Sequence, residues 1–261
     1  WRFSEFFPFI NDPGNIVTMG EGNTRLIEGI ESAEYAGLRR LTFKHQGDNP
    51  TGSFKDTGMS VGISAAKMLG MEVVACASTG NTSASMAAYA KRAGMLPVVL
   101  LPKGKISSGK LAQALDYGAL TLQVPTDFDG VMKLIMEVAP QAGVYIVNSI
   151  NPFRIEGQKT MIAELLEQRN WQVPDRIVVP GGNLGHASSI WKALRELKEL
   201  GFIDKLPLLN VIQAAGADPL YQSVTTHPDR LVPMHPRTLA TAIQIGNPVS
   251  FWKAMDGVKQ T

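Results

Sequence analysis

The stretch "EVVACASTGNTSASMAAYAKRAGMLPVVLLP", residues 72–102, holds two apolar segments separated by a run of mostly small residues. Residues 72–78 and 97–102 are short and apolar, which is typical of buried strands. Residues 83–94 are small, interrupted by polar positions, and end at a glycine, which is typical of a helix. Parallel strands need a long crossover connection, usually a helix. We therefore predict a strand–helix–strand unit and a parallel sheet here.

The same alternation runs through most of the chain. Further strands are expected at residues 40–46, 120–125, 144–149, 176–182 and 208–216. Helices are expected at residues 53–70, 107–118, 128–143, 155–170 and 187–201. Repeated units of this kind predict an α/β fold whose parallel sheets are covered by helices on both faces, in three layers. The chain after residue 216 is less regular and rich in proline and histidine.

Composition narrows the class of protein. The 261 residues are 44% hydrophobic, and the formal charge is +2 without a long run of like charge. This argues against a nucleic-acid partner, which needs a clustered basic face. No apolar run reaches the ~18 residues of a membrane span, and the start of the chain does not read as a signal peptide. The single cysteine, Cys76, excludes an internal disulfide and a cysteine-rich zinc site. We expect it to be buried and inert, and the protein to be cytoplasmic.

Ligands of parallel sheets bind in the loops that lead from strands into helices. One such loop, "DNPTGSFKDTG", residues 48–58, carries Lys55 at a predicted helix start. Ser53 and Asp56 fit a capping box, which explains them as an ordinary helix start. Lys55 is not explained in this way, because a cation in the first helical turn is unfavourable by about 0.3–1 kcal/mol. The same field favours a neutral amine, which a lysine needs to attack a carbonyl, so a catalytic and a merely structural interpretation both stand.

Two further loops resemble anion sites. The loop "STGNTSAS", residues 78–85, has five hydroxyl groups at a predicted helix start, more than capping by Thr82 or Ser83 alone requires. The loop "GGNLGH", residues 181–186, offers successive backbone N–H groups to a phosphate, although it is neither a P-loop nor a dinucleotide fingerprint. His186 is interpreted as a helix-start residue rather than a base.

A fourth loop places Arg154 in a predicted first helical turn. Its guanidinium suits bidentate recognition of a phosphate or carboxylate. The alternative is a surface arginine paired with Glu156. We predict that all four loops lie on one edge of one sheet, where a cofactor that bears a phosphate and an aldehyde would use them together.

Five segments, "EGNTRL", "NPTGSFKD", "ACASTGNTSAS", "NSINPFRIEGQKT" and "ATAIQIGNP", together resemble the threonine synthases, pyridoxal-phosphate enzymes of fold type II. The resemblance extends from about residue 21 to residue 247. It implies that pyridoxal phosphate is the cofactor, and that O-phosphohomoserine and water give threonine and phosphate. The alternatives are a related threonine or serine dehydratase, and a catalytically silent homologue that binds a phosphorylated metabolite.

The resemblance also implies roles for individual residues. Lys55 would carry the cofactor and shuttle protons, and Asn81 would bind its ring hydroxyl. The cofactor phosphate would be bound by Gly182, Asn183, Leu184, Gly185 and His186. The substrate would be bound by Ser78, Thr79 and Thr82 at its carboxylate, and by Asn148, Ser149 and Arg154 at its phosphate. No metal is implied.

Three larger features follow from the same resemblance. We expect a smaller, mobile domain at residues 45–152 and a larger domain formed by residues 1–44 and 153–261. Family members form homodimers, so a homodimer is expected. Family members also continue beyond the position of residue 261, so we expect a C-terminally truncated chain in which no residue can be assigned to the pyridine nitrogen.

Overall fold

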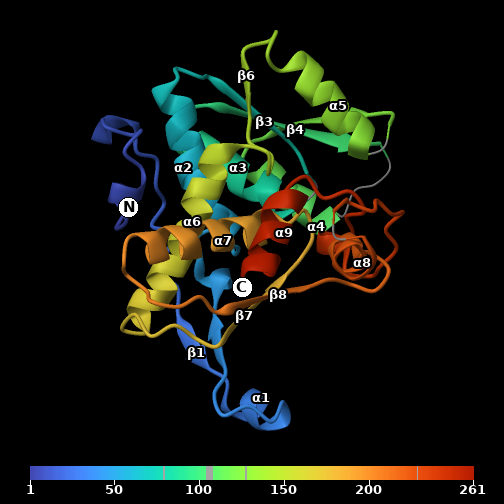
Figure 1. Cartoon of the computed structure of the whole chain (residues 1–261). Helices are drawn as coiled ribbons and strands as arrows, with labels where there is room; N and C mark the ends of the chain where they lie inside the picture. The colour runs from blue at the N-terminus through green and yellow to red at the C-terminus, as the bar shows by residue number, and fades with distance from the viewer. Residues whose placement is uncertain (79, 104–107, 127, 228) are drawn as a thin grey trace. The chain divides into compact units, whose positions relative to one another are not determined.

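The computed structural model describes residues 1–78, 80–103, 108–126, 128–227 and 229–261 (Figure 1). These residues form two compact units, residues 1–157 and residues 158–261, each with its own sheet and core. The predicted division at residues 45 and 152 is a different one, and it stays a prediction.

The first unit is built on a four-stranded parallel sheet. The strand order is β5-β4-β3-β6, so β3 is central and its neighbours run in the same direction. The bounds are Val73–Ala77 for β3, Leu96–Pro102 for β4, Leu120–Val124 for β5 and Val144–Ile146 for β6. The four strands fall within the predicted segments or one residue beyond them, and the predicted parallel pairing is confirmed.

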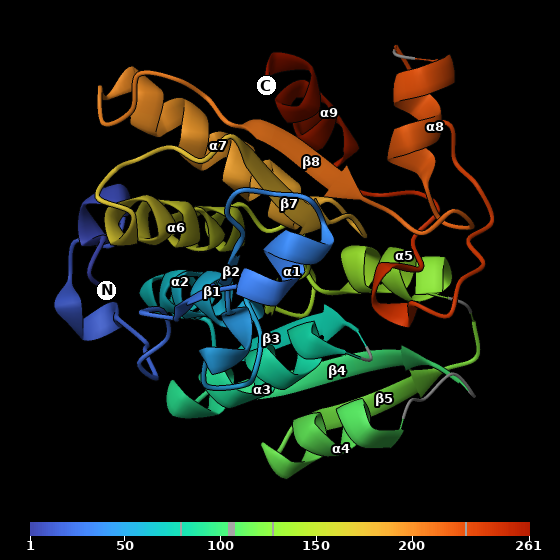
Figure 2. The ribbon, with the colours of Figure 1, turned by 90° about the horizontal axis from the view of Figure 1, so that it is seen from below.

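Helices cover both faces of this sheet, as the alternation predicts (Figure 2). On one face, Val74 and Cys76 of β3 pack with buried residues from the three helices α2, α3 and α4. On the other face, Ala75 packs against Ile135 and Ala139 around α5. The bounds are Lys55–Met68 for α2, Asn81–Arg92 for α3, Ser108–Asp116 for α4 and Phe128–Val138 for α5. Side chains of β3 therefore alternate between two helical layers.

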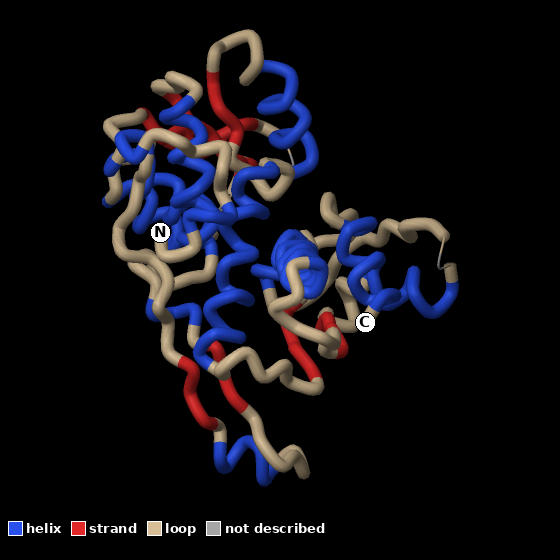
Figure 3. Tube along the Cα trace, turned by 60° about the vertical axis from the view of Figure 1, so that its left-hand side comes forward, coloured by secondary structure: helices blue, strands red, loops and turns tan. Residues whose placement is uncertain are grey.

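A short antiparallel pair lies apart from this sheet. Strand β1, Leu26–Glu28, pairs with β2, Thr42–Lys44, and α1, Ile30–Tyr35, lies between them in the chain (Figure 3). The prediction that residues 40–46 begin the parallel sheet is therefore wrong. A β-branched and aromatic pattern identifies a strand, but it does not identify the strand with which it pairs.

The second unit holds a two-stranded parallel sheet of β7, Arg176–Pro180, and β8, Leu208–Ile212. Helices α7, Gly185–Glu199, and α9, Phe251–Gln260, pack on it and on each other. Trp191 Nε1 donates to Asp256 Oδ2 at 2.7 Å and joins these two helices. Helix α8, Pro219–Thr226, and α9 lie in the part of the chain where no regular element was predicted.

Helix α6, Pro152–Gln168, begins in the first unit and continues into the second. Short 3-10 helices complete the structure at Ser4–Phe6, Pro13–Asn15, Gln46–Asp48 and Thr241–Ile243. Among the described residues, no helix is both long and apolar enough to cross a membrane.

Candidate active site

Lys55 is the first residue of α2, as the sequence predicts. The helix begins without the predicted capping box: Phe54 is the N-cap residue and makes no side-chain cap. Ser53 Oγ accepts only from the backbone N–H of Lys55, at 3.3 Å, and the carboxylate of Asp56 binds elsewhere. Phe54 is half-buried, and its ring centroid lies 4.2 Å from Lys55 Nζ.

The amine of Lys55 lies in surroundings that favour its neutral form. Loss of hydration lowers its pKa to about 7, and the positive charge of Arg154 contributes in the same direction. At neutral pH a substantial fraction of the amine is therefore unprotonated. That is the state in which a lysine attacks a carbonyl.

Arg154 is the largest fully buried side chain among the described residues, with 1% of its surface exposed. Its Nη1 donates to Val147 O at 2.7 Å, while its buried Nε has no hydrogen-bond partner. Burial lowers its pKa to about 10. None of the described carboxylates pairs with it, so the alternative of a surface ion pair with Glu156 is wrong.

Glycines make the space that Arg154 occupies. A Cβ at Gly62 of α2 would lie 2.9 Å from Arg154 Cγ. One turn after Arg154, a Cβ at Gly157 would lie 2.3 Å from Thr57 O and 2.8 Å from Gly58 Cα. The start of α6 therefore lies at backbone contact with the first turns of α2. This close approach positions the buried guanidinium near the end of α2 that carries Lys55.

The loop after β3 leads directly into α3. Asn81 is the first residue of that helix and is exposed, and Gly80 at the N-cap position makes no side-chain cap. Ser78 Oγ accepts from Gly80 N at 3.1 Å, and Ser83 Oγ donates to Gly80 O at 2.7 Å. Capping by Thr82 or Ser83 is therefore not seen, and the first N–H groups of α3 are available to an anion. Thr79 lies outside the described residues.

The loop after β6 is joined to the loop after β3. The side chain of Asn148 bonds both backbone groups of Ala77, with its Oδ1 3.1 Å from the N and its Nδ2 2.9 Å from the O. Ser149 is half-buried beside it. Asn151 caps α6, because its Oδ1 accepts from Phe153 N at 3.0 Å. Since β3 and β6 are parallel neighbours, these two loops lie at the same edge of the sheet.

The glycine-rich loop lies in the second unit, between β7 and α7. Leu184, at the N-cap of α7, has φ 62° and is buried, and the helix has no side-chain cap. A Cβ at Gly182 would meet Ile243 Cα at 3.2 Å, so the "ATAIQIGNP" segment lies against this loop. Gly185 and His186 are the first two residues of α7, and Asn183 Oδ1 accepts from Val249 N at 2.7 Å. The result is a cradle of backbone N–H groups at a helix start.

The four loops do not lie on one edge of one sheet, so that prediction is wrong. Lys55 follows β2 of the separate antiparallel pair, and the glycine-rich loop follows β7 of a separate sheet in the second unit. Of these four loops, the two after β3 and β6 share an edge of one sheet. The lysine loop is connected to the four-stranded sheet by the packing of α2 on α3 and not by strand pairing.

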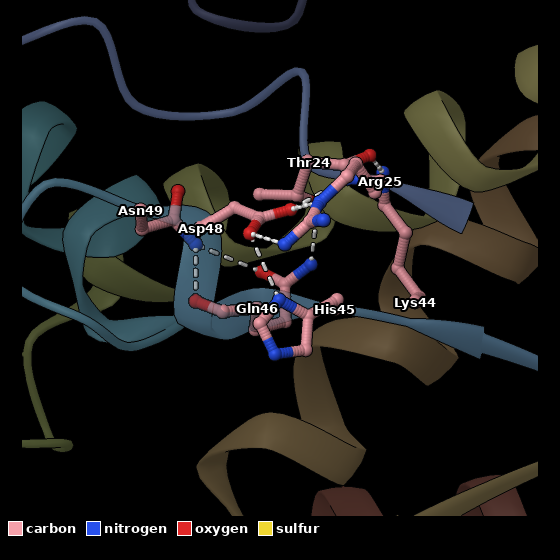
Figure 4. Close-up of polar contacts among 7 residues, drawn as sticks. All are labelled: Thr24, Arg25, Lys44, His45, Gln46, Asp48 and Asn49. Carbon is pink, nitrogen blue, oxygen red and sulfur yellow. Dashed lines mark hydrogen bonds and ion pairs between the residues drawn. The ribbon is translucent and has the colours of Figure 1, made fainter. Parts of the chain in front are cut away.

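A polar cluster fixes the segment that leads to the lysine loop (Figure 4). The carboxylate of Asp48 accepts from Arg25 Nε at 2.8 Å and Nη2 at 2.7 Å, and lies 2.9 Å from His45 Nδ1. These hydrogen bonds, above all those from Arg25, hold the pKa of Asp48 well below its usual range. Asn49, one residue on, accepts from Gly22 N at 3.0 Å. Apart from the "EGNTRL" segment itself, no local pattern in the sequence indicates these contacts.

Comparison with known proteins identifies the family. The profile of the family described as pyridoxal-phosphate dependent enzyme matches residues 17–259. A threonine synthase of Bacillus sp. is 41% identical over 261 residues, which cover all of this chain and 71% of that protein. The chain belongs to the threonine synthase family. A threonine synthase of Methanocaldococcus jannaschii is 49% identical over 259 residues, and the chain spans 64% of its length.

Solved structures show the same fold at lower identity. The processed form of threonine deaminase isoform 2 from Solanum lycopersicum matches with a TM-score of 0.78 and 16% identity, over 98% of this chain and 68% of that chain. Maize serine racemase matches with a TM-score of 0.74 and 23% identity, over 91% and 71%. The predicted α/β fold of the fold type II enzymes is confirmed.

The residues of this threonine synthase family member fit its cofactor, pyridoxal phosphate. An aldehyde needs an unprotonated amine, and Lys55 has a pKa of about 7. A phosphate needs several N–H donors and close backbone approach, and the loop at Gly182 and Leu184 offers both. The two features lie in different units, and each fits its part of the cofactor separately.

Proposed function

We propose that this chain catalyses the reaction of the threonine synthases, in which O-phosphohomoserine and water give threonine and inorganic phosphate. Identity of 41% to 49% with threonine synthases over nearly the whole chain supports this reaction. The observation that carries the proposal is Lys55, a helix-start lysine whose pKa of about 7 suits attachment of an aldehyde. Pyridoxal phosphate, when bound, supplies an electron sink for charge that develops on the substrate.

The residues of the chain divide the remaining work. Lys55 Nζ would hold the cofactor and would move protons at the α and β carbons of the substrate. The cofactor phosphate would be held by backbone N–H groups in the loop before α7 and at the first two residues of that helix. These residues are Gly182, Asn183, Leu184, Gly185 and His186. Asn81 binds the cofactor's ring hydroxyl, and its place at the first residue of α3 agrees with this role.

The substrate has two anionic ends, and two loops of the first unit suit them. Ser78, Thr79 and Thr82 bind the carboxylate at the uncapped start of α3. Asn148, Ser149 and Arg154 bind the phosphate that leaves. Support for the last role comes from Arg154, a buried cation that pairs with none of the described carboxylates and has an unpartnered Nε. Such a group is costly unless an anion joins it.

Larger features of the proposal rest on the family alone. We propose a homodimer in the cytoplasm, and a mobile domain of residues 45–152 that closes on the substrate and excludes water. Domain closure is testable by comparing proteolysis rates with and without the substrate.

The decisive experiment measures phosphate and threonine formed from O-phosphohomoserine, with pyridoxal phosphate added. Lys55→Ala should abolish both products. Lys67→Ala, on the same helix but bonded only to Gly14 O at 2.8 Å, should leave turnover unchanged. A ketoacid as the product, or no phosphate release from the folded unmodified chain, would contradict the proposal.

A further inference from the structure

The carboxylate next to Lys55 is buried and strongly hydrogen-bonded. Asp56 has no exposed surface. Its Oδ2 accepts from Thr51 N at 2.7 Å, and its Oδ1 accepts from Thr51 Oγ1 at 2.5 Å and Ser85 Oγ at 2.6 Å. Burial raises its pKa, and the hydrogen bonds from Ser85 and Thr51 oppose that shift. One side chain thus receives three short hydrogen bonds from two separate segments.

The first of these segments is the turn that delivers Lys55 to α2. Gly52 has φ 78°, which suits a glycine in a tight turn, and its N–H donates to Asn49 O at 2.8 Å. Asp56 holds the turn at Thr51, while Asn49 is held from the other side by Gly22 N at 3.0 Å. The turn is therefore fixed at two points within six residues of Lys55.

The second segment is α3, which begins at Asn81. Ser85 lies in its second turn and has no exposed surface. One turn later, Tyr89 OH donates to Glu21 Oε2 at 2.7 Å. Asp56 and Glu21 therefore bind the same face of α3, at Ser85 and at Tyr89, which are four residues apart. As a result, the turn that carries Lys55 is fixed to the helix whose first residue is Asn81.

A purely structural explanation of Asp56 is weak. A buried carboxylate is costly to desolvate, and none of the described cations forms an ion pair with Asp56. Its place in the first turn of α2 offsets part of that cost, because the helix N-terminus favours negative charge. An apolar residue would satisfy packing alone, but it could not accept three hydrogen bonds that set the geometry of the turn.

We infer that Asp56 is a positioning residue for Lys55. It acts by joining the turn before Lys55, at Thr51, to α3, at Ser85. The inference rests on the proposed function, because its effect is on the attachment of pyridoxal phosphate to Lys55. Removing the hydrogen bonds of Asp56 leaves Lys55 at the start of α2 but lets the turn before it move. The attachment of pyridoxal phosphate to Lys55 therefore weakens even when the protein stays folded.

The test measures attachment directly, without turnover. Pyridoxal phosphate is titrated into the chain, the lysine-bound cofactor is trapped with borohydride, and the modified peptide is quantified by mass spectrometry. The variants are Asp56→Asn and Ser85→Ala. The matched control is Ser64→Ala, a fully buried serine of α2 that bonds Val17 N at 2.8 Å and Ser60 O at 2.7 Å, away from the turn.

We expect Asp56→Asn and Ser85→Ala to raise the half-saturating cofactor concentration at least about tenfold, which corresponds to about 1.4 kcal/mol. Ser64→Ala and Ser85→Ala should lower the melting temperature by similar amounts. Ser64→Ala should nevertheless leave the half-saturating cofactor concentration unchanged. Unchanged attachment in folded Ser85→Ala protein would overturn the inference, even if Asp56→Asn does not fold. No attachment in the unmodified chain would contradict the proposed function, and the inference with it.

Discussion

Two basic side chains of the first unit, Lys55 and Arg154, are desolvated without a neutralising partner among the described carboxylates. Folding accepts this cost at a site where two anionic ligands are proposed to bind. Both charges can be tested through the protonation of Lys55, because Arg154 contributes to lowering its pKa.

The pKa of Lys55 should be visible in the reactivity of the protein without cofactor. Modification of Lys55 by an amine reagent, followed by mass spectrometry across pH, should show a midpoint near pH 7. Arg154→Met should move this midpoint upward, because it removes a nearby positive charge. Arg92→Met, at an exposed position in the last turn of α3, is the control and should leave the midpoint unchanged.

The same pKa predicts how stability depends on pH. Below pH 7 Lys55 is protonated in the folded and unfolded states, so the folded state bears the full cost of its desolvated charge. Between pH 7 and 10.5 only the unfolded state keeps the proton, and the cost falls as pH rises. Lys55→Met should therefore raise the free energy of unfolding most below pH 7, and this gain should vanish by about pH 10.5. A gain that is independent of pH, measured by urea denaturation, would contradict a lowered pKa.

The unusual residues are visible in the sequence, but the residues that hold them in place are not. Lys55 and Arg154 were identified because a cation in a first helical turn is unfavourable, and this signal is local. The spacing of Asp56 indicates half of a capping box, because spacing alone cannot show that its donors are Thr51 and Ser85. Ser85 lies 29 residues from Asp56, and a contact at that separation has no local signal.

Helix packing gives the clearest prediction at the scale of elements. Gly157 brings α6 to backbone contact with α2, and the two atoms nearest to an added Cβ, Thr57 O and Gly58 Cα, belong to the backbone and cannot move aside as a flexible side chain can. Gly157→Ala should therefore destabilise the protein by about 3 kcal/mol or more, at the upper end for overpacked sites. In the control Gly14→Ala, the nearest atoms to the added Cβ belong to the flexible carboxylate of Asp12. This substitution should change the free energy of unfolding by less than about 0.5 kcal/mol. Urea denaturation of both variants checks the difference.

An ion pair between α6 and α7 gives a second prediction for elements. Glu196 accepts from Lys159 and Lys192, each at 2.8 Å; burial opposes its ionisation, but the two lysines outweigh it and lower its pKa. Glu196→Gln should cost about 1–3 kcal/mol at pH 7, reduced from the value for full burial because part of Glu196 is exposed. The loss should fade as pH falls below about 4.5, where Glu196 is protonated first in the unfolded state, and it should vanish once pH is also below the lowered pKa of the folded state. Glu199→Gln, in an exposed pair with Arg195 at 3.6 Å, should change little.

The long helices and the strands of the parallel sheets were predictable because their hydrophobic patterns are continuous. Helix α9 was missed because it is short and contains Gly257, which lowers helix propensity. That glycine is required by packing, since a Cβ there would lie 2.8 Å from Trp191 Cβ. Strand β2 was found but assigned to the wrong sheet, because pairing depends on partners distant in sequence.

At the scale of the whole molecule, the two compact units should unfold in separate transitions. Cys76 is buried in the first unit, and burial raises the pKa of its thiol to about 12, so it should react only when that unit opens. Trp171, Trp191 and Trp252 all lie in the second unit. In a Trp1→Phe background, thiol labelling and tryptophan fluorescence therefore report on different units.

Variants in each unit test this independence. Val74→Ala, in the core of the first unit, should lower the denaturant midpoint seen by Cys76 labelling more than the midpoint seen by fluorescence. Leu194→Ala, a fully buried residue of α7, should do the reverse. Equal shifts of both probes in both variants would show that the units unfold together.

The attachment of Asp56 and Glu21 at Ser85 and Tyr89 has a consequence for how this chain can change over evolution. Four residues are about one helical turn, so both attachments depend on the length of α3 between them and not only on the identity of the residues. One inserted residue there would rotate Tyr89 by about 100° and break its bond to Glu21 while Ser85 kept its own. Substitutions should therefore accumulate in this turn far more readily than insertions or deletions.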